Sequence, residues 1–182
     1  VKAIVTGEDA KGALQGKILR DMPVLCWDTV RYIGDRVAAV AAETPEAAEE
    51  ALIALEVDYE VLPAVFDPMK AQKPDAPLLH EDIASYVGAP LELMAPDVHN
   101  GQTRLAWNKG DLEQGFREAD VVLEHSFSIP SRHQGYIEPF ASIIAIDDEG
   151  RIQAWCSSKA PFRARRQMAQ ALDLDEETIK VN

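Results

Sequence analysis

The sequence predicts a mixed α/β protein built in two units, and three observations lead to this fold class. An apolar run at 37–42 is followed by a helical segment and then by a segment that alternates between apolar and polar residues. Further along, two apolar runs flank the turn signal Asp148-Glu149-Gly150. Between these parts prolines recur and hydrophobic periodicity disappears. We therefore divide the chain into residues 1–62, an extended proline-rich connection at 63–110 and a second unit at 111–182.

The first unit is predicted as a β-α-β arrangement. After a short strand and a glycine-punctuated loop within residues 1–28, the continuous apolar run Val37–Ala42 predicts a strand covered on both faces. Thr44 offers a helix N-cap and Pro45 a first helical residue, so we expect a helix to about Leu55. The alternation of Val57–Val61 predicts the strand that follows. The acidic residues of this helix are interpreted as a solvated face rather than a metal site, because no histidine converges with them: Glu46, Glu49 and Glu50.

The second unit is predicted to begin with a short helix and a strand. Asp111 is a suitable cap for a helix ending near Ala119. The alternation of Val121–Ile129 then predicts a strand, and His125 falls on its apolar face, where we interpret it as a core residue.

A hairpin, a helix and a final strand are predicted to complete the second unit. Ala141–Ile146 and Ile152–Cys156 form the hairpin, and Thr178–Val181 has strand composition. Pro161 begins the helix, which runs to about Leu172. Its core stripe is Ala160, Ala164, Met168 and Leu172, while its arginines, Arg163, Arg165 and Arg166, point elsewhere.

Composition excludes several classes of partner. Of 182 residues 47% are hydrophobic, enough for a sizeable core, and 31 acidic residues against 18 basic ones give a net charge of −13. This charge repels nucleic acid and anionic lipid, so we expect no nucleic-acid and no membrane partner. Two cysteines, Cys26 and Cys156, cannot build a disulfide framework, and no signal peptide or apolar span is present. The sequence is therefore interpreted as cytoplasmic, with two free thiols.

Three isolated residues receive structural interpretations. Cys26 is expected to be a small buried hydrophobe, because nothing basic beside it in sequence would lower its pKa. His80 and His99 lie alone in the proline-rich connection, without a second ligand at metal-binding spacing. Each is expected to be a surface or hydrogen-bonded histidine.

Two sequence blocks carry a family resemblance. The segment His133–Pro139, followed by the hairpin and by Trp155–Pro161, resembles the start of the molybdenum-cofactor domain in the large subunit of the xanthine dehydrogenase, aldehyde oxidase and carbon monoxide dehydrogenase family. Upstream, Val30–Val40 and Val57–Pro63 resemble the hammerhead domain that precedes it. The resemblance implies a hammerhead-like β-α-β unit followed by the beginning of a mixed α/β molybdopterin-binding domain.

The resemblance also implies an activity and a site. Members hydroxylate an aldehyde or a xanthine-like nitrogen heterocycle, with water as the oxygen source, on a molybdenum bound by a pterin dithiolene. The loop matching His133 to Glu138 approaches the metal, so Gln134, Gly135 and His133 are the expected cofactor-binding residues, while Glu138 more often stabilises the loop. Alternatively, this segment is only a turn entering a hairpin. Many members carry glutamine where Lys159 stands, and another where Arg132 or His133 stands, so the field at the metal would differ here.

Cofactors and partners follow from the same resemblance. We expect molybdopterin, as the cytosine dinucleotide, in the full-length enzyme, with iron–sulfur clusters and FAD on partner subunits or domains. Val1 opens directly on an apolar run and the chain stops in a strand-like segment, so we expect a fragment that holds no cofactor and is inactive alone. Its uncovered apolar surface predicts self-association. The alternative function is a non-catalytic module that docks the iron–sulfur and flavin subunits.

Overall fold

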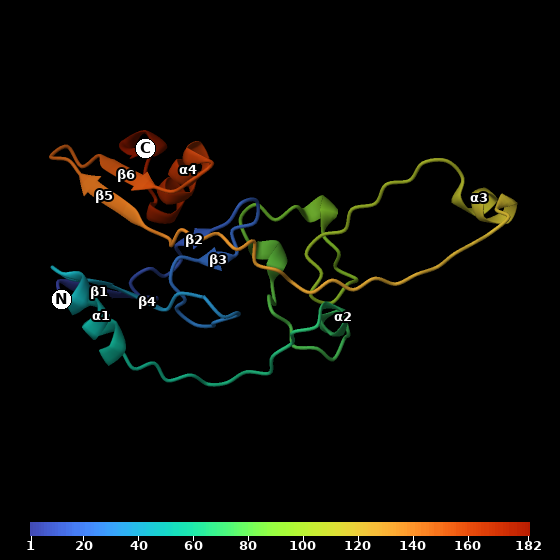
Figure 1. Ribbon diagram of the computed structural model, residues 1–182, viewed down its shortest axis with the longest axis horizontal. Helices are drawn as coiled ribbons and strands as arrows, with labels where there is room; N and C mark the ends of the chain where they lie inside the picture. Colours follow the sequence, from blue (N-terminus) through green and yellow to red (C-terminus); the bar gives the residue numbers. More distant parts are fainter. The chain divides into compact units, whose positions relative to one another are not determined.

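The computed structural model describes residues 1–182, apart from the side chain of Leu93, and divides them into two units. Val1–Arg104 and Ser142–Asn182 form one unit, and Leu105–Ala141 form the other. The strands are β1 (Ala3–Thr6), β2 (Leu14–Gln15), β3 (Met22–Pro23), β4 (Ala38–Ala41), β5 (Ser142–Ile146), β6 (Ile152–Cys156) and β7 (Ile179–Val181) (Figure 1). The α-helices are α1 (Pro45–Ala54), α2 (Pro68–Ala71), α3 (Leu112–Glu118) and α4 (Pro161–Leu172). Three short 3-10 helices add Ile83–Ser85, Leu91–Leu93 and Glu176–Thr178.

Helix α1 forms as its cap signal predicts. The Thr44 hydroxyl accepts a hydrogen bond from the Ala47 N–H at 3.2 Å, and Pro45 occupies the first turn. Before it, β4 pairs antiparallel with β1, with Ala3 opposite Ala41. Residues along β4 alternate between half-buried and exposed, so the expected coverage of both faces is wrong.

The strand expected at 57–61 is absent, so the β-α-β unit is not closed. Val57, Tyr59 and Val61 are exposed, and their backbone has no strand assignment. Alternation supplies a suitable side-chain pattern, but a strand also needs a neighbouring edge to receive its hydrogen bonds. None of the strands in the described part of the chain pairs with this segment. The mixed α/β class is nevertheless as predicted, with helices and small sheets.

Side-chain hydrogen bonds hold the turns of the proline-rich region together and join this region to the loop before β4. The Asn100 amide donates to the carbonyls of Ala71 and Pro77, and its oxygen accepts from the Leu79 N–H at 2.9 Å. The Arg31 Nε donates to the Leu79 carbonyl at 3.0 Å. The Asn100 side chain thus joins separate turns of this region, and the Arg31 side chain joins the region to the loop before β4.

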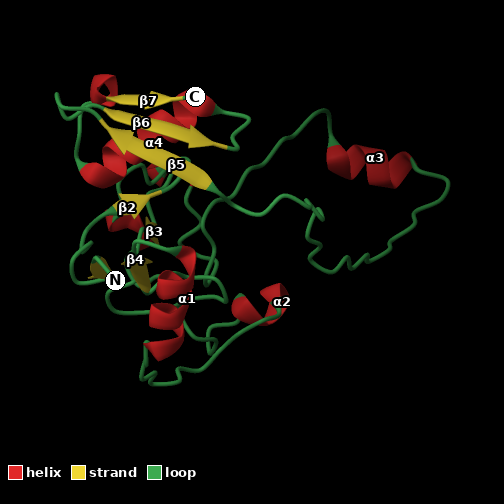
Figure 2. Cartoon of the chain, turned by 60° about the vertical axis from the view of Figure 1, so that its left-hand side comes forward, coloured by secondary structure: helices red, strands yellow, loops and turns green.

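The C-terminal sheet is the best-packed part of the unit formed by Val1–Arg104 and Ser142–Asn182. β5 and β6 form the predicted antiparallel hairpin, and β7 adds to β6 in parallel, with Ile152 opposite Ile179. Figure 2 shows α4 along one face of this sheet. Ala154, Ala169 and Ile179 are almost fully buried there. The hairpin and the strand composition of the last residues are confirmed.

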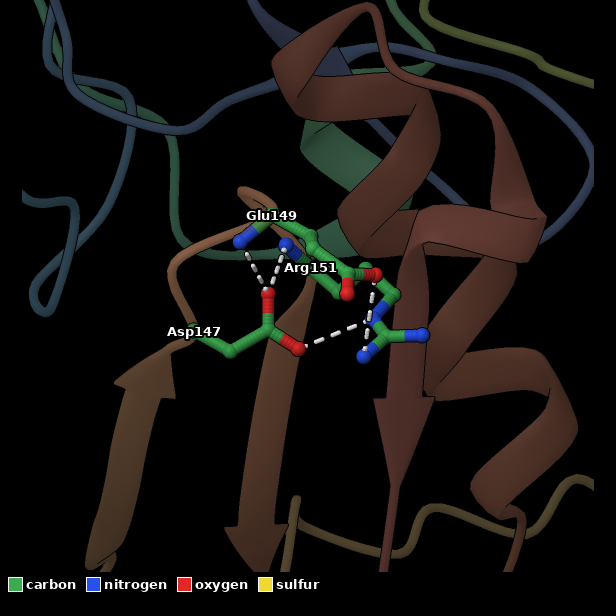
Figure 3. A network of polar contacts seen from close by, with 3 residues as sticks. All are labelled: Asp147, Glu149 and Arg151. Carbon is green, nitrogen blue, oxygen red and sulfur yellow. Dashed lines mark hydrogen bonds and ion pairs between the residues drawn. The ribbon is translucent and has the colours of Figure 1, made fainter.

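The turn of the hairpin is held by one carboxylate. Asp147 accepts hydrogen bonds from the N–H groups of Glu149 and Arg151 and from the Arg151 Nε (Figure 3). The last of these is also an ion pair, at 2.8 Å. The N–H groups of Glu149 and Arg151 therefore find their acceptor in Asp147, the residue directly before the predicted turn signal.

Helix α4 has the predicted bounds, but its buried face differs from the predicted stripe. Ala169 is the buried residue of this helix, whereas Leu172 is 57% exposed. Arg165 is half-buried, because α4 packs on both β7 and β2, and its Nη2 lies 3.6 Å from the Glu176 carboxylate. Two packing partners widen the covered face beyond one row of residues.

The unit formed by Leu105–Ala141 contains a single helix within its described residues. The Asp111 carboxylate caps α3 by accepting from the Gln114 N–H at 2.9 Å, as predicted. The strand expected at 121–129 is absent, and His125 is exposed rather than a core residue. Phe127 is 89% exposed and Ile129 86% exposed, so this segment has no sheet on which its alternating apolar face is buried.

Candidate functional site

The loop that the resemblance selects lies at 131–139, directly before β5. Every residue from Ser131 to Pro139 is exposed. No described residue of this loop belongs to a helix or strand, so its conformation depends on local contacts. An exposed polar loop can reach a ligand without burying its own backbone groups.

Local contacts join two of the three predicted cofactor-binding residues. The Gly135 N–H donates a hydrogen bond to the Nδ1 of His133 at 3.0 Å. Gly135 has a φ of 74°, in the left-handed region that favours glycine. Gln134 lies between them and is exposed. The three residues thus form one short turn, and a Cβ built on Gly135 meets no atom within 4 Å.

Aromatic side chains continue from this turn. The rings of His133 and Tyr136 have centroids 4.6 Å apart and are tilted by 55°. Tyr136 in turn contacts Phe140, at 5.4 Å between centroids. Phe140 is 89% exposed, so this row of rings offers apolar surface beside a polar turn.

The charged residues considered for the cofactor or metal site are mostly exposed. Arg132 is exposed in the same loop, and Lys159 is exposed two residues before α4, in the other unit. Glu138 takes part in an interaction within the structure. The acidic residues of α1 remain solvent-exposed, and the described residues contain no group of three or more His, Cys, Asp or Glu suited to a metal ion.

Both histidines of the proline-rich region are hydrogen-bonded, as predicted. His80 Nδ1 lies 3.1 Å from the Tyr86 hydroxyl, and His99 Nε2 lies 2.8 Å from the Ala76 carbonyl oxygen. Burial lowers the pKa of His80, and the nearby positive charge of Arg31 lowers it further. Both residues line an open hollow of about 540 Å³, which no pattern in the sequence predicts.

The two thiols are free, as predicted. Cys26 is buried and Cys156 half-buried. Burial raises the pKa of the Cys26 thiol, and the Asp35 carboxylate acts in the same direction. A raised pKa keeps the thiol protonated and unreactive, which agrees with its interpretation as a small hydrophobe.

Two family models match the chain in the order expected. Residues 1–63 match the a/b hammerhead domain of aldehyde oxidase and xanthine dehydrogenase, and residues 95–182 match the molybdopterin cofactor-binding domain. The second match contains the turn at 133–135 and the β5–β6 hairpin. The chain belongs to the family of molybdenum hydroxylase large subunits, which are molybdopterin oxidoreductases.

Individual relatives are similar over almost the whole chain. A probable xanthine dehydrogenase subunit of Bacillus subtilis (strain 168) is 35% identical over 100% of this chain and 22% of its own length. The nicotinate dehydrogenase large molybdopterin subunit of Eubacterium barkeri is 31% identical over 91% of this chain and 35% of its own length. A reconstituted CO dehydrogenase from Oligotropha carboxidovorans matches in structure with a TM-score of 0.77 and 29% identity, over 98% of this chain and 23% of its own. The chain spans between about a fifth and a third of the length of these relatives.

Proposed function

We propose that this chain is part of a large subunit that hydroxylates a nitrogen heterocycle, taking the oxygen from water. The observation that carries the proposal is the polar turn at 133–135 within the stretch matched to the molybdopterin cofactor-binding domain. Xanthine and nicotinate, named in two relatives, are both nitrogen heterocycles, and this favours such a substrate over an aldehyde or carbon monoxide.

The residues of the turn fit a molybdenum cofactor that brings its own metal ligands. The protein binds and orients such a cofactor through hydrogen bonds and does not need to supply the metal ligands. The described residues contain no metal-ligand cluster of their own. The Gln134 amide is a neutral donor, and the open space beside the Gly135 backbone admits a bulky group. When bound, the cofactor supplies the redox chemistry of hydroxylation. The chain's own residues bind the group, orient it and donate hydrogen bonds to it.

Cofactor form and partners belong to the same proposal. We expect molybdopterin as the cytosine dinucleotide, and electrons passing to iron–sulfur clusters and FAD on partner subunits or domains. The two free thiols support a reducing compartment such as the cytoplasm. In the described part of the chain, none of the helices has the length and apolar character that crossing a bilayer requires.

A docking module is the second candidate function. It is favoured by large apolar side chains of the second unit that remain uncovered, such as Trp107 at 84% and Phe127 at 89% exposure. Contact with the iron–sulfur and flavin subunits would cover them. The two functions are separable, because docking alone needs no intact turn at 133–135.

The Gln134→Ala variant of the holoenzyme tests the catalytic proposal. Loss of a preorganised neutral donor beside the reacting centre costs about 3 kcal/mol in the transition state, so kcat should fall roughly a hundredfold. Molybdenum content and steady-state turnover on a nitrogen heterocycle are measured together. The matched control is Gln102→Ala, which removes the same amide at an exposed position outside the loop and should change kcat less than about threefold.

Two results decide between the functions. A Gln134 variant with full molybdenum and near-normal turnover contradicts the site assignment and leaves docking as the better proposal. A hundredfold loss in this variant alone, with subunit assembly unchanged, supports the catalytic site.

A further inference from the structure

The hydrogen bond between the Gly135 N–H and the His133 ring determines which ring nitrogen of the histidine accepts and which donates. A backbone N–H can only donate, so the Nδ1 that receives it at 3.0 Å carries no proton. A neutral imidazole in this contact therefore holds its proton on Nε2. The side of the ring that faces the loop is an acceptor, and the opposite nitrogen is a donor.

The same bond closes a turn around Gln134. Donor and acceptor are two residues apart, which is the spacing at which Asn and Asp side chains stabilise turns by accepting from the backbone. The turn holds Gly135 at its φ of 74°. The imidazole ring also contacts the ring of Tyr136, at 4.6 Å between centroids. A polar and an aromatic contact thus fix the imidazole over the loop.

We propose that His133 is a positioning residue, whose Nδ1 fixes the turn that presents the Gln134 amide to the cofactor and whose Nε2–H remains as an outward donor. The inference rests on the proposed function, because His133 acts through Gln134. An exposed glutamine loses conformational entropy of its side chain and backbone when it binds a ligand. A turn that is already closed has lost part of this backbone entropy before binding, so the entropic cost of binding is smaller.

Two substitutions separate the acceptor from the ring. His133→Phe keeps an aromatic ring for Tyr136 but has no acceptor. His133→Asn has no ring, but its Oδ1 can receive the Gly135 N–H in the same two-residue turn. Residue-resolved hydrogen–deuterium exchange at the Gly135 amide, in the holoenzyme and in the cofactor-free protein, reports the contact without relying on activity.

The exchange experiment has definite outcomes. In His133→Phe the Gly135 amide should exchange about fivefold faster than in the wild type, as for loss of one ordinary hydrogen bond. In His133→Asn it should stay within about twofold of the wild type. Equal exchange in the wild type and the Phe variant, or a faster rate in both variants, overturns the proposal.

Turnover then tests whether His133 acts through Gln134. His133→Phe should lower kcat about tenfold, a part of the roughly hundredfold effect of removing the amide itself, and His133→Asn should restore most of it. In a Gln134→Ala background the Phe substitution should change kcat less than about twofold. Additive losses would overturn the positioning role. If Gln134→Ala alone leaves turnover normal, the proposed function fails at this site, and Gly135 exchange still decides whether His133 fixes the turn.

Discussion

At the scale of single residues, Asp147 shows how one carboxylate stabilises a turn. It accepts two backbone N–H groups and the Arg151 guanidinium (Figure 3). The Arg151 side-chain hydrogen bond lowers the pKa of Asp147 most, and the Arg151 backbone bond lowers it further. The turn signal in the sequence begins at the next residue, so the glycine-containing turn was predictable but the residue that holds it was not.

The lowered pKa of Asp147 gives a prediction with a definite sign. Because the folded-state pKa lies below the unfolded-state value, ionised Asp147 stabilises the protein above the unfolded-state pKa, and this contribution is lost as the pH falls through the folded-state pKa. Asp147→Asn should therefore lower the thermal midpoint at about pH 7, and it should lower it less as the pH falls toward about 2.5. Circular dichroism melts at both pH values measure this. Asp148→Asn, one residue away, is the control; an equal pH-dependent difference for both variants would contradict the assignment.

At the scale of elements, the starts of three helices were predictable from local signals, whereas two of the expected strands lack the partner that they need. Helices α1, α3 and α4 begin at the predicted residues, because a capping side chain or a proline fixes each start locally. The strands expected at 57–61 and 121–129 are absent, because alternation describes a face but does not supply the edge on which a strand pairs. The candidate site residues His133, Gln134 and Gly135 were selected by a family resemblance. The hydrogen bond that joins His133 to Gly135 was not predicted, because it depends on a side-chain rotamer that the sequence does not specify.

The cap of α1 provides an element-scale test. Thr44→Ala removes the acceptor for the Ala47 N–H and should destabilise the helix by about 1 kcal/mol. Thr44→Ser keeps the hydroxyl and should recover most of this loss. Hydrogen–deuterium exchange of the α1 amides measures the difference, with the β5–β6 amides as an internal reference that neither substitution touches. Equal α1 exchange in both variants would mean that the hydroxyl does not stabilise the helix.

At the scale of the whole molecule, much apolar surface has no cover. Large apolar side chains are exposed in both units among the described residues, for example Ile143 at 68% and Phe127 at 89%. Only small groups of side chains are buried among the described residues, and none of the buried ones is polar or charged. Some exposed large apolar residues belong to ordered strands, including Ile143, Ile144 and Ile146 of β5. β5 also lies at the edge of its sheet, where backbone groups can pair with another strand.

Residues 1–182 by themselves should therefore self-associate, and ionic strength should control how strongly. Apolar surface on β5 favours association, whereas a net charge of −13 opposes it through repulsion that salt screens. The apparent mass from light scattering should rise with added salt, and an environment-sensitive hydrophobic dye should fluoresce on binding. Ile143→Lys should reduce both signals, whereas Gln102→Lys, which makes the same charge change at an exposed polar position, should not. A strictly monomeric species that binds no dye at high salt would contradict the prediction, because such a chain would have covered its own apolar surface.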